Sequence, residues 1–170
     1  MLYKPEYDEN GKKILCEMNG VNSDMLMDIY VKKLKKGETL DILEDKNECA
    51  VLLLGGKVNF KVGDSIDEVC QRKNPFEKKP YAVHFPHSVK ASVVAVEDSE
   101  VLVQMTDNEK VWEPVFYNPD NCLYQEFGKG QWNGAGHRVV STMFDLDNAP
   151  YSNMVMGEVF NQPGKWSSYP

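Results

Sequence analysis

Short runs of β-forming residues alternate with turn residues along most of this 170-residue chain, and this spacing restricts the fold more than any other feature. Runs spaced by about 8 to 12 residues are typical of sandwiches and barrels. No run keeps a period of 3.6 residues, so no long helix is expected. The pattern predicts an all-β protein, a jelly-roll barrel or sandwich with little helix. The runs lie at 26–34, 39–45, 49–63, 81–85, 91–97, 99–106, 137–146 and 152–160.

The most specific local prediction is a hairpin within CAVLLLGGKVNFKVG, residues 49–63. Gly55 and Gly56 separate two β-rich runs, and a Gly-Gly pair accepts the positive φ angles of a two-residue hairpin turn. Beyond it, the polar stretch 64–80 begins with a Ser65-x-x-Glu68 capping pattern and is expected to hold one helical turn at most. Residues 107–136 contain prolines and several glycines and are expected to be irregular.

Composition excludes several classes of protein. Hydrophobic residues make up 42% of the chain and aromatic residues 11%, as in an ordinary globular domain. A net charge of −7 argues against a nucleic-acid partner, which would call for a basic surface. The lysine cluster at 32–36 is interpreted as the solvated end of a strand.

The cysteines and the N-terminus favour a cytoplasmic location. The four cysteines are widely spaced, and none belongs to a Cys-x-x-Cys pair. The N-terminal residues lack the apolar segment of a signal peptide. The longest strongly apolar run, 50–54, is far shorter than the ~20 residues that span a bilayer. We therefore expect reduced thiols and no membrane partner.

The residues alone do not predict a catalytic constellation. His84 and His87 are three positions apart with Pro86 between them, which does not favour a shared metal on a strand. Arg138 could clamp a carboxylate through its planar guanidinium, or pair with a surface acid. The glycine-rich stretch 128–136 lacks dinucleotide-loop spacing and leads into a strand, so a surface loop is favoured.

The last fourteen residues, GEVFNQPGKWSSYP, differ in kind from the rest. They predict a strand, a turn at Pro163 and Gly164, and a segment rich in aromatic and serine residues. A tryptophan face can stack on a sugar, and serine hydroxyls can bind its oxygens. Alternatively, the aromatic side chains pin this loop to the barrel.

This motif resembles the central motif of the 5-deoxy-glucuronate isomerases of inositol breakdown, which are two-cupin proteins. In that family the motif leads into a His-x-His segment that holds a divalent metal together with a later Glu and His. Weaker similarity covers 55–58, 83–103 and 137–145. The whole chain is similar to the N-terminal half of such an isomerase, and the family's metal ligands would begin after Pro170.

The resemblance implies two parts. Residues 1–150 would form an N-terminal cupin-like domain with a degenerate metal site, and residues 151–170 the first strand and entry loop of a second cupin domain. No catalytic residue, metal ligand or cofactor is assigned to this chain, although the full-length family implies a divalent metal. The expected neighbourhood of the substrate pocket comprises Arg138, Glu158, Trp166, Ser167, Ser168 and Tyr169.

The favoured hypothesis is that this chain is the supporting N-terminal half of a metal-dependent aldose–ketose isomerase, shortened either naturally or artificially. On that hypothesis the chain is inactive alone. Its expected partners are the C-terminal cupin half or an equivalent and, through an exposed apolar face, further copies of itself. One alternative is a stand-alone, metal-free cupin module that binds a sugar acid or mediates assembly. Another is a small metal enzyme that uses His84, His87 or His137 with a carboxylate.

Overall fold

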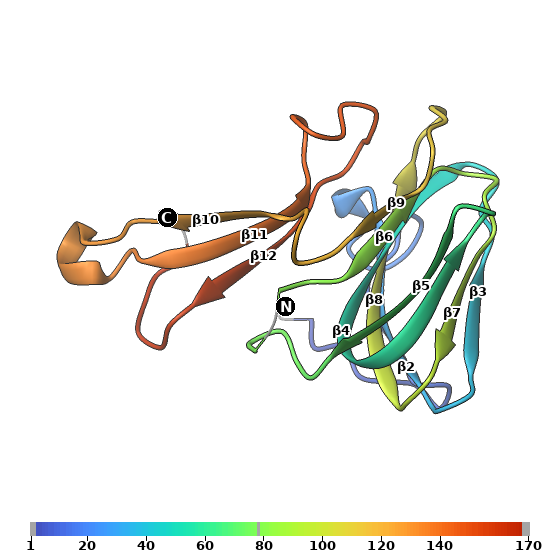
Figure 1. The fold of residues 1–170 in the computed structure, drawn as a ribbon, viewed down its shortest axis with the longest axis horizontal. Coiled ribbons are helices and arrows are strands. Elements are labelled where there is room, and N and C mark those ends of the chain that lie inside the picture. Colours follow the sequence, from blue (N-terminus) through green and yellow to red (C-terminus); the bar gives the residue numbers. More distant parts are fainter. Residues whose placement is uncertain (1–2, 78, 168–170) are drawn as a thin grey trace.

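The computed structural model describes residues 3–77 and 79–167 (Figure 1). Almost all regular structure in these residues is strand, and the helical segments are two short 3-10 turns, η1 (Ser23–Met25) and η2 (Gln131–Gly134). The strands are β1 (Lys12–Cys16), β2 (Asp28–Leu34), β3 (Thr39–Ile42), β4 (Asn47–Val62), β5 (Ile66–Arg72), β6 (Ala82–Phe85), β7 (Ala91–Ala95), β8 (Ser99–Asp107), β9 (Val115–Tyr117), β10 (Leu123–Phe127), β11 (Arg138–Phe144) and β12 (Met156–Asn161).

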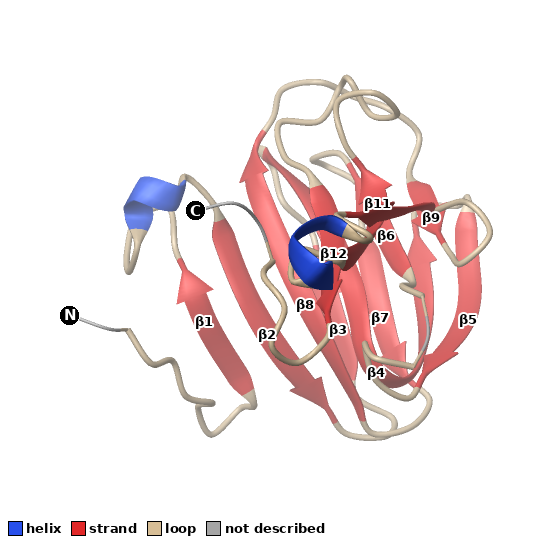
Figure 2. Cartoon of the chain, turned by 90° about the vertical axis from the view of Figure 1, so that its left-hand side faces the viewer, coloured by secondary structure: helices blue, strands red, loops and turns tan. Residues whose placement is uncertain are grey.

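Strands β1 to β9 form a two-layer barrel of antiparallel pairs, with β4 common to both layers. One layer has the order β1-β2-β8-β4-β6-β9, and its first strands lie side by side in Figure 2. The other layer contains β3, β7, the second half of β4, and β5. Alternate side chains from both layers fill the interior, including Val51, Phe60 and Val103, each with no exposed surface. The all-β prediction with little helix is therefore confirmed.

The hairpin prediction at Gly55 and Gly56 is wrong. β4 runs through both glycines, and here it leaves its pairing with β8 and begins its pairing with β5. Gly56 has a φ of +101°, and a Cβ there would lie 2.4 Å from the carbonyl oxygen of Asp98. The glycines therefore bend one strand between two layers, as glycine does at barrel corners. The expected alternation beyond them is confirmed, since Val58 and Phe60 are both fully buried.

The expected helical turn after residue 64 is also wrong. Residues 66–72 form β5, which pairs with β4 over seven registered positions from Gly56–Arg72 to Val62–Ile66. Ile66, Cys70 and Arg72 are buried on its inner side. The capping pattern Ser65-x-x-Glu68 is a local signal for a helix. Residues 66–72 form a strand instead because they can pair with the edge of β4, and neighbouring residues alone do not reveal that pairing.

Strands β10, β11 and β12 form a separate antiparallel sheet, here called the arm sheet. It extends away from the barrel in Figure 1 and is seen nearly end-on in Figure 2. The expectation that residues 107–136 are irregular is wrong in part, because barrel strand β9 and arm-sheet strand β10 both lie within this range. The boundary expected between residues 150 and 151 stays a prediction, although β10 and β11 pair with β12 rather than with the barrel.

A second apolar cluster joins the arm sheet to the barrel. It contains outward-facing barrel residues such as Ala50 and Ala82, residues from the ends of β11 and β12 such as Phe144 and Met156, and Met154 from the connection between those strands. The outer face of β4 and β6 is thus covered by the chain that leads into the arm sheet. Within the described residues, no helix is long and apolar enough to cross a membrane.

Candidate functional site

One polar contact that positions the arm sheet is an ion pair between Arg72 and Glu158. Arg72 ends β5 and its side chain is fully buried, while Glu158 lies in β12 with a side chain 20% exposed. Arg72 Nη1 donates to Glu158 Oε1 at 2.8 Å, and Nη2 donates to Oε2 at 2.6 Å. The same guanidinium donates to the carbonyl oxygens of Leu53 and Pro75 at 3.0 and 3.2 Å. This bidentate geometry orients the carboxylate as well as neutralising it.

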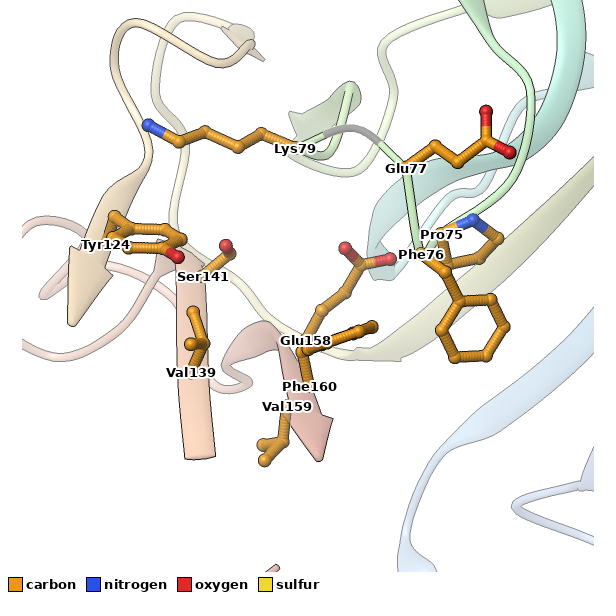
Figure 3. A pocket seen from close by; sticks show the side chains of 10 residues that line it. All are labelled: Pro75, Phe76, Glu77, Lys79, Tyr124, Val139, Ser141, Glu158, Val159 and Phe160. Atoms are coloured by element: carbon orange, nitrogen blue, oxygen red, sulfur yellow. The ribbon is translucent and has the colours of Figure 1, made fainter. Parts of the chain in front are cut away.

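Beside this pair lies a cavity of about 540 Å³, here called the junction cavity (Figure 3). It lies between the chain that joins β5 to β6 and one face of the arm sheet. Alternation along β11 and β12 brings four of its arm-sheet residues to one face, because Ser141 pairs with Glu158 and Val139 with Phe160. The lining residues are Pro75, Phe76, Glu77, Lys79, Tyr124, Val139, Ser141, Glu158, Val159 and Phe160.

A second, smaller cavity of about 240 Å³, here called the loop cavity, lies at the β10–β11 hairpin. Arg138 and the rings of Trp132 and Trp166 line it. The Arg138 guanidinium lies 5.3 Å from the Phe127 ring centroid, and the two tryptophan rings are 6.4 Å apart. The Trp132 ring packs on Gly136, where a Cβ would come within 2.9 Å of it. The Trp166 backbone N–H donates to the carbonyl oxygen of Ala135 at 2.8 Å, which holds the two segments together.

The structure divides the residues that the sequence suggested for one pocket. Arg138 and Trp166 meet in the loop cavity, whereas Glu158 lines the junction cavity. Strand alternation explains the separation, because Glu158 pairs with Ser141, three positions from Arg138 in β11. Ser167 is exposed and is not among the residues lining either cavity. Ser168 and Tyr169 lie outside the described residues.

Sequence reasoning missed Arg72, Lys79, Tyr124 and Ser141. A signal for Arg72 existed, because Ile66, Cys70 and Arg72 follow the two-residue period of a strand whose even positions face inward. The other three come from separate segments, and only the tertiary structure brings them together.

The three histidines lie in different environments. His84 is fully buried on the outer side of β6, with its ring stacked 4.0 Å from that of Phe144. Its Nε2 lies 3.1 Å from Glu48 Oε2. His87 contacts the hydroxyl of its neighbour Ser88 at 3.1 Å, and His137 lies 3.5 Å from the carboxylate of Glu126. No histidine pair suited to a metal results.

Glu48 is the centre of a buried hydrogen-bond cluster. Its carboxylate accepts from the Asn153 backbone N–H at 2.7 Å and from the Ser152 hydroxyl at 3.1 Å, in addition to its contact with His84. Ser152 and Asn153 belong to the β11–β12 connection. The cluster therefore ties that connection to the barrel.

A divalent metal does not fit the ligand-type residues of this structure. No group of three or more His, Cys, Asp or Glu side chains suited to a metal occurs among residues 3–77 and 79–167. Protein metal sites commonly need three or four such ligands. The barrel interior in particular is apolar, and Glu48 and His84 face away from it.

Burial makes the cysteines poor nucleophiles. All four are free and buried. Desolvation raises the pKa of Cys49 well above its ordinary value, that of Cys70 to about 12 and that of Cys122 to about 11. The thiolate is the reactive form, so these side chains remain neutral thiols at neutral pH.

The fold defines a class: a two-layer antiparallel barrel with one strand shared between layers is a cupin-type jelly roll. Within that class, the chain belongs to the KduI/IolB family, whose model matches residues 1–170. A crystal structure of an IolB-like protein from Salmonella typhimurium LT2 is similar, with a TM-score of 0.71 and 25% identity. That similarity covers 82% of this chain and 52% of the other.

Curated relatives carry a common name. The chain is 25% identical to a 5-deoxy-glucuronate isomerase of Bacillus licheniformis over 176 residues, and 27% identical to that of Bacillus subtilis strain 168 over 183 residues. Each comparison covers 100% of this chain and 63% of the relative. The chain thus spans less than two thirds of the length of these relatives.

Proposed function

We propose that this chain forms the N-terminal supporting part of a 5-deoxy-glucuronate isomerase-like protein that acts in inositol breakdown. The observation that carries the proposal is the family match over all 170 residues, combined with coverage of only 63% of the isomerase relatives. The Arg72–Glu158 pair supports it, because a buried bidentate contact suits an element that holds another in a fixed orientation.

The proposed parent reaction is an aldose–ketose isomerisation, in which a proton moves between neighbouring carbons. A divalent metal, where it is bound, polarises the carbonyl and hydroxyl oxygens of the substrate. The described residues of this chain offer no fitting ligand group, so we assign the chain no step of that reaction. Its role in the proposal is to support and orient the part that carries the ligands.

The proposed partner is the remainder of the isomerase sequence, packed against the arm sheet. Several large apolar side chains on the arm sheet are exposed, among them Leu123, Phe127 and Val159 at 48%, 39% and 52%. Such surfaces favour association. In the absence of that partner we expect the chain to form a homo-oligomer in the cytoplasm, and light scattering that finds a monomer at high concentration would contradict this expectation.

Metal analysis of the purified chain tests the supporting role. We expect substoichiometric divalent metal after purification, and weak binding when zinc or manganese is titrated calorimetrically. One tightly bound metal ion per chain would contradict the proposal, and would favour a small metal enzyme that uses one of the three histidines. The readout does not depend on activity.

A second candidate function is sugar-acid binding in the loop cavity, favoured by the meeting of Arg138 with two tryptophans. The guanidinium suits a carboxylate, and the indole rings suit the C–H face of a sugar. Glucuronate should then raise the melting temperature, and Arg138→Met should abolish that shift. An equal shift in the variant would contradict binding at this cavity.

A further inference from the structure

The junction cavity has a size and position typical of small-molecule sites. Its volume of about 540 Å³ lies within the usual range for ligand pockets, which often occur between packed units. One wall comes from the barrel through residues 75–77 and 79, and the other from the arm sheet. A molecule bound here would contact both.

Three polar groups converge on one side of this cavity. Figure 3 shows Lys79 above Tyr124, with the Tyr124 and Ser141 hydroxyls close to one another. The Lys79 Nζ lies 4.9 Å from the Tyr124 ring centroid and makes a long contact of 3.4 Å to the Pro119 carbonyl oxygen. Ser141 is only 8% exposed. Among residues 3–77 and 79–167 neither the Tyr124 nor the Ser141 hydroxyl makes a side-chain hydrogen bond, so both are available to a ligand.

The other side of the cavity is apolar. Phe76 and Phe160 meet edge to face with ring centroids 5.7 Å apart, and Val139 lies beside them on β11. Phe76 is 76% exposed, which is unusual for a ring that lines a cavity. Covering this ring would remove a large apolar surface from water.

The carboxylates in the cavity do not oppose an anionic ligand. Glu158 is neutralised by the bidentate contact with Arg72, and Glu77 is paired with Lys73 at 3.0 Å. Both carboxylates lie on the side away from Lys79 in Figure 3. The positive charge of Lys79 therefore dominates the side that carries the free hydroxyls.

We propose that the junction cavity binds a small organic carboxylate with an apolar body. Lys79 and the hydroxyls of Tyr124 and Ser141 bind the carboxylate, and Phe76 and Phe160 contact the apolar body. The site is independent of the isomerase role and of the loop cavity, which lies on the opposite face of β11. Its occupant stabilises the orientation of the arm sheet, because it touches the barrel and the arm at once.

Phenylacetate is a suitable probe, with benzyl alcohol as its neutral counterpart. Amide resonances of the intact chain, followed by NMR during titration at millimolar concentrations, should shift at residues 124, 141 and 160 with phenylacetate. Benzyl alcohol should bind at least about tenfold more weakly, since it lacks the charge-assisted contact with Lys79. Equal binding of the two probes, or no binding of phenylacetate, would overturn the proposal.

Variants locate the site. Lys79→Met and Ser141→Ala should each weaken phenylacetate binding, and Lys79→Met by about tenfold or more. The matched control Lys36→Met alters an exposed lysine near the β2–β3 turn and should leave binding unchanged. Circular dichroism checks that each variant folds. Unchanged binding in Lys79→Met, or shifts centred on residues 127–138, would assign the ligand elsewhere and refute the site.

Discussion

Arg72 and Glu158 lie 86 positions apart in the sequence, yet their side chains form a bidentate ion pair in which the guanidinium is fully buried. The pair joins the end of β5 in the barrel to β12 in the arm sheet. It is therefore both a boundary of the junction cavity and the contact that fixes how the two sheets meet.

Removing Glu158 should destabilise the protein strongly. Glu158→Ala removes the carboxylate that contacts the buried Arg72 in bidentate fashion, and breaking a buried pair in this way costs about 3–5 kcal/mol. Urea unfolding measures the loss. The control Asp67→Asn removes an exposed ion pair with Lys61 and should cost less than about 1 kcal/mol. Similar losses in the two variants would show that Arg72 is not desolvated as described.

Gly56 and Gly37, which have the two largest positive φ angles among the described glycines, should differ in their tolerance of alanine. Gly56→Ala places a Cβ 2.4 Å from the carbonyl oxygen of Asp98 in a bent strand, and should destabilise by several kcal/mol, on the scale of about 3 or more. At Gly37 the φ is +87° but no atom lies within 4 Å of the added Cβ, so only backbone strain of about 1–2 kcal/mol applies. Thermal unfolding compares them, and equal losses would argue against the close approach at Gly56.

The buried cluster at Glu48 should control the β11–β12 connection. Glu48→Ala leaves the Asn153 N–H and His84 without their shared acceptor, at about 1–3 kcal/mol for each unsatisfied group, while the Ser152 hydroxyl keeps its 2.9 Å contact to the Met154 carbonyl oxygen. Ser152→Ala removes one donor to Glu48 and the acceptor of the Met154 N–H, and should cost about 1 kcal/mol. Limited proteolysis within 145–153 should therefore accelerate more in Glu48→Ala. Equal rates in the wild type and both variants would contradict the anchoring role.

Alkaline pH should reduce stability through the buried thiols. Burial raises the pKa of Cys70 from 9.0 to about 12 and that of Cys122 from 9.0 to about 11, so the unfolded chain ionises first. The stability that the neutral buried thiols contribute to the folded state is fully present below pH 9.0 and is lost as the pH rises towards 11 and 12. The urea midpoint should fall across that interval. Replacing Cys49, Cys70 and Cys122 with alanine should flatten the fall, and an unchanged slope would assign it to other groups.

Much of the fold could be predicted from the sequence, because the signals for individual strands are local. Alternation in residues 58–62 and the apolar runs of β6, β7 and β8 are properties of short segments, and the structure confirms them. Two wrong predictions, the hairpin and the helical turn, concern segments whose structure is determined by strand pairing. Gly55 and Gly56 are compatible both with a hairpin turn and with a bend of one strand between two layers. The sequence of β5 is mostly polar, and its strand conformation depends on pairing with the edge of β4.

The candidate sites were less predictable for the same reason. Arg138 and Trp166 could be suggested from their chemistry, and the structure brings them together in the loop cavity. Glu158 was suggested for the same pocket, but strand alternation places it on the other face. Lys79, Tyr124 and Ser141 come from three segments that carry no motif, and only the packing of the arm sheet on the barrel assembles them.

The most direct test of the supporting role is turnover of 5-deoxy-glucuronate by the purified chain with added divalent metal. It is measured alone and after mixing with the separately purified remainder of the Bacillus subtilis isomerase. We predict no turnover by the chain alone above the protein-free rate, and turnover in the mixture. Saturable turnover by the chain alone, unchanged by addition of the second fragment, would contradict the account.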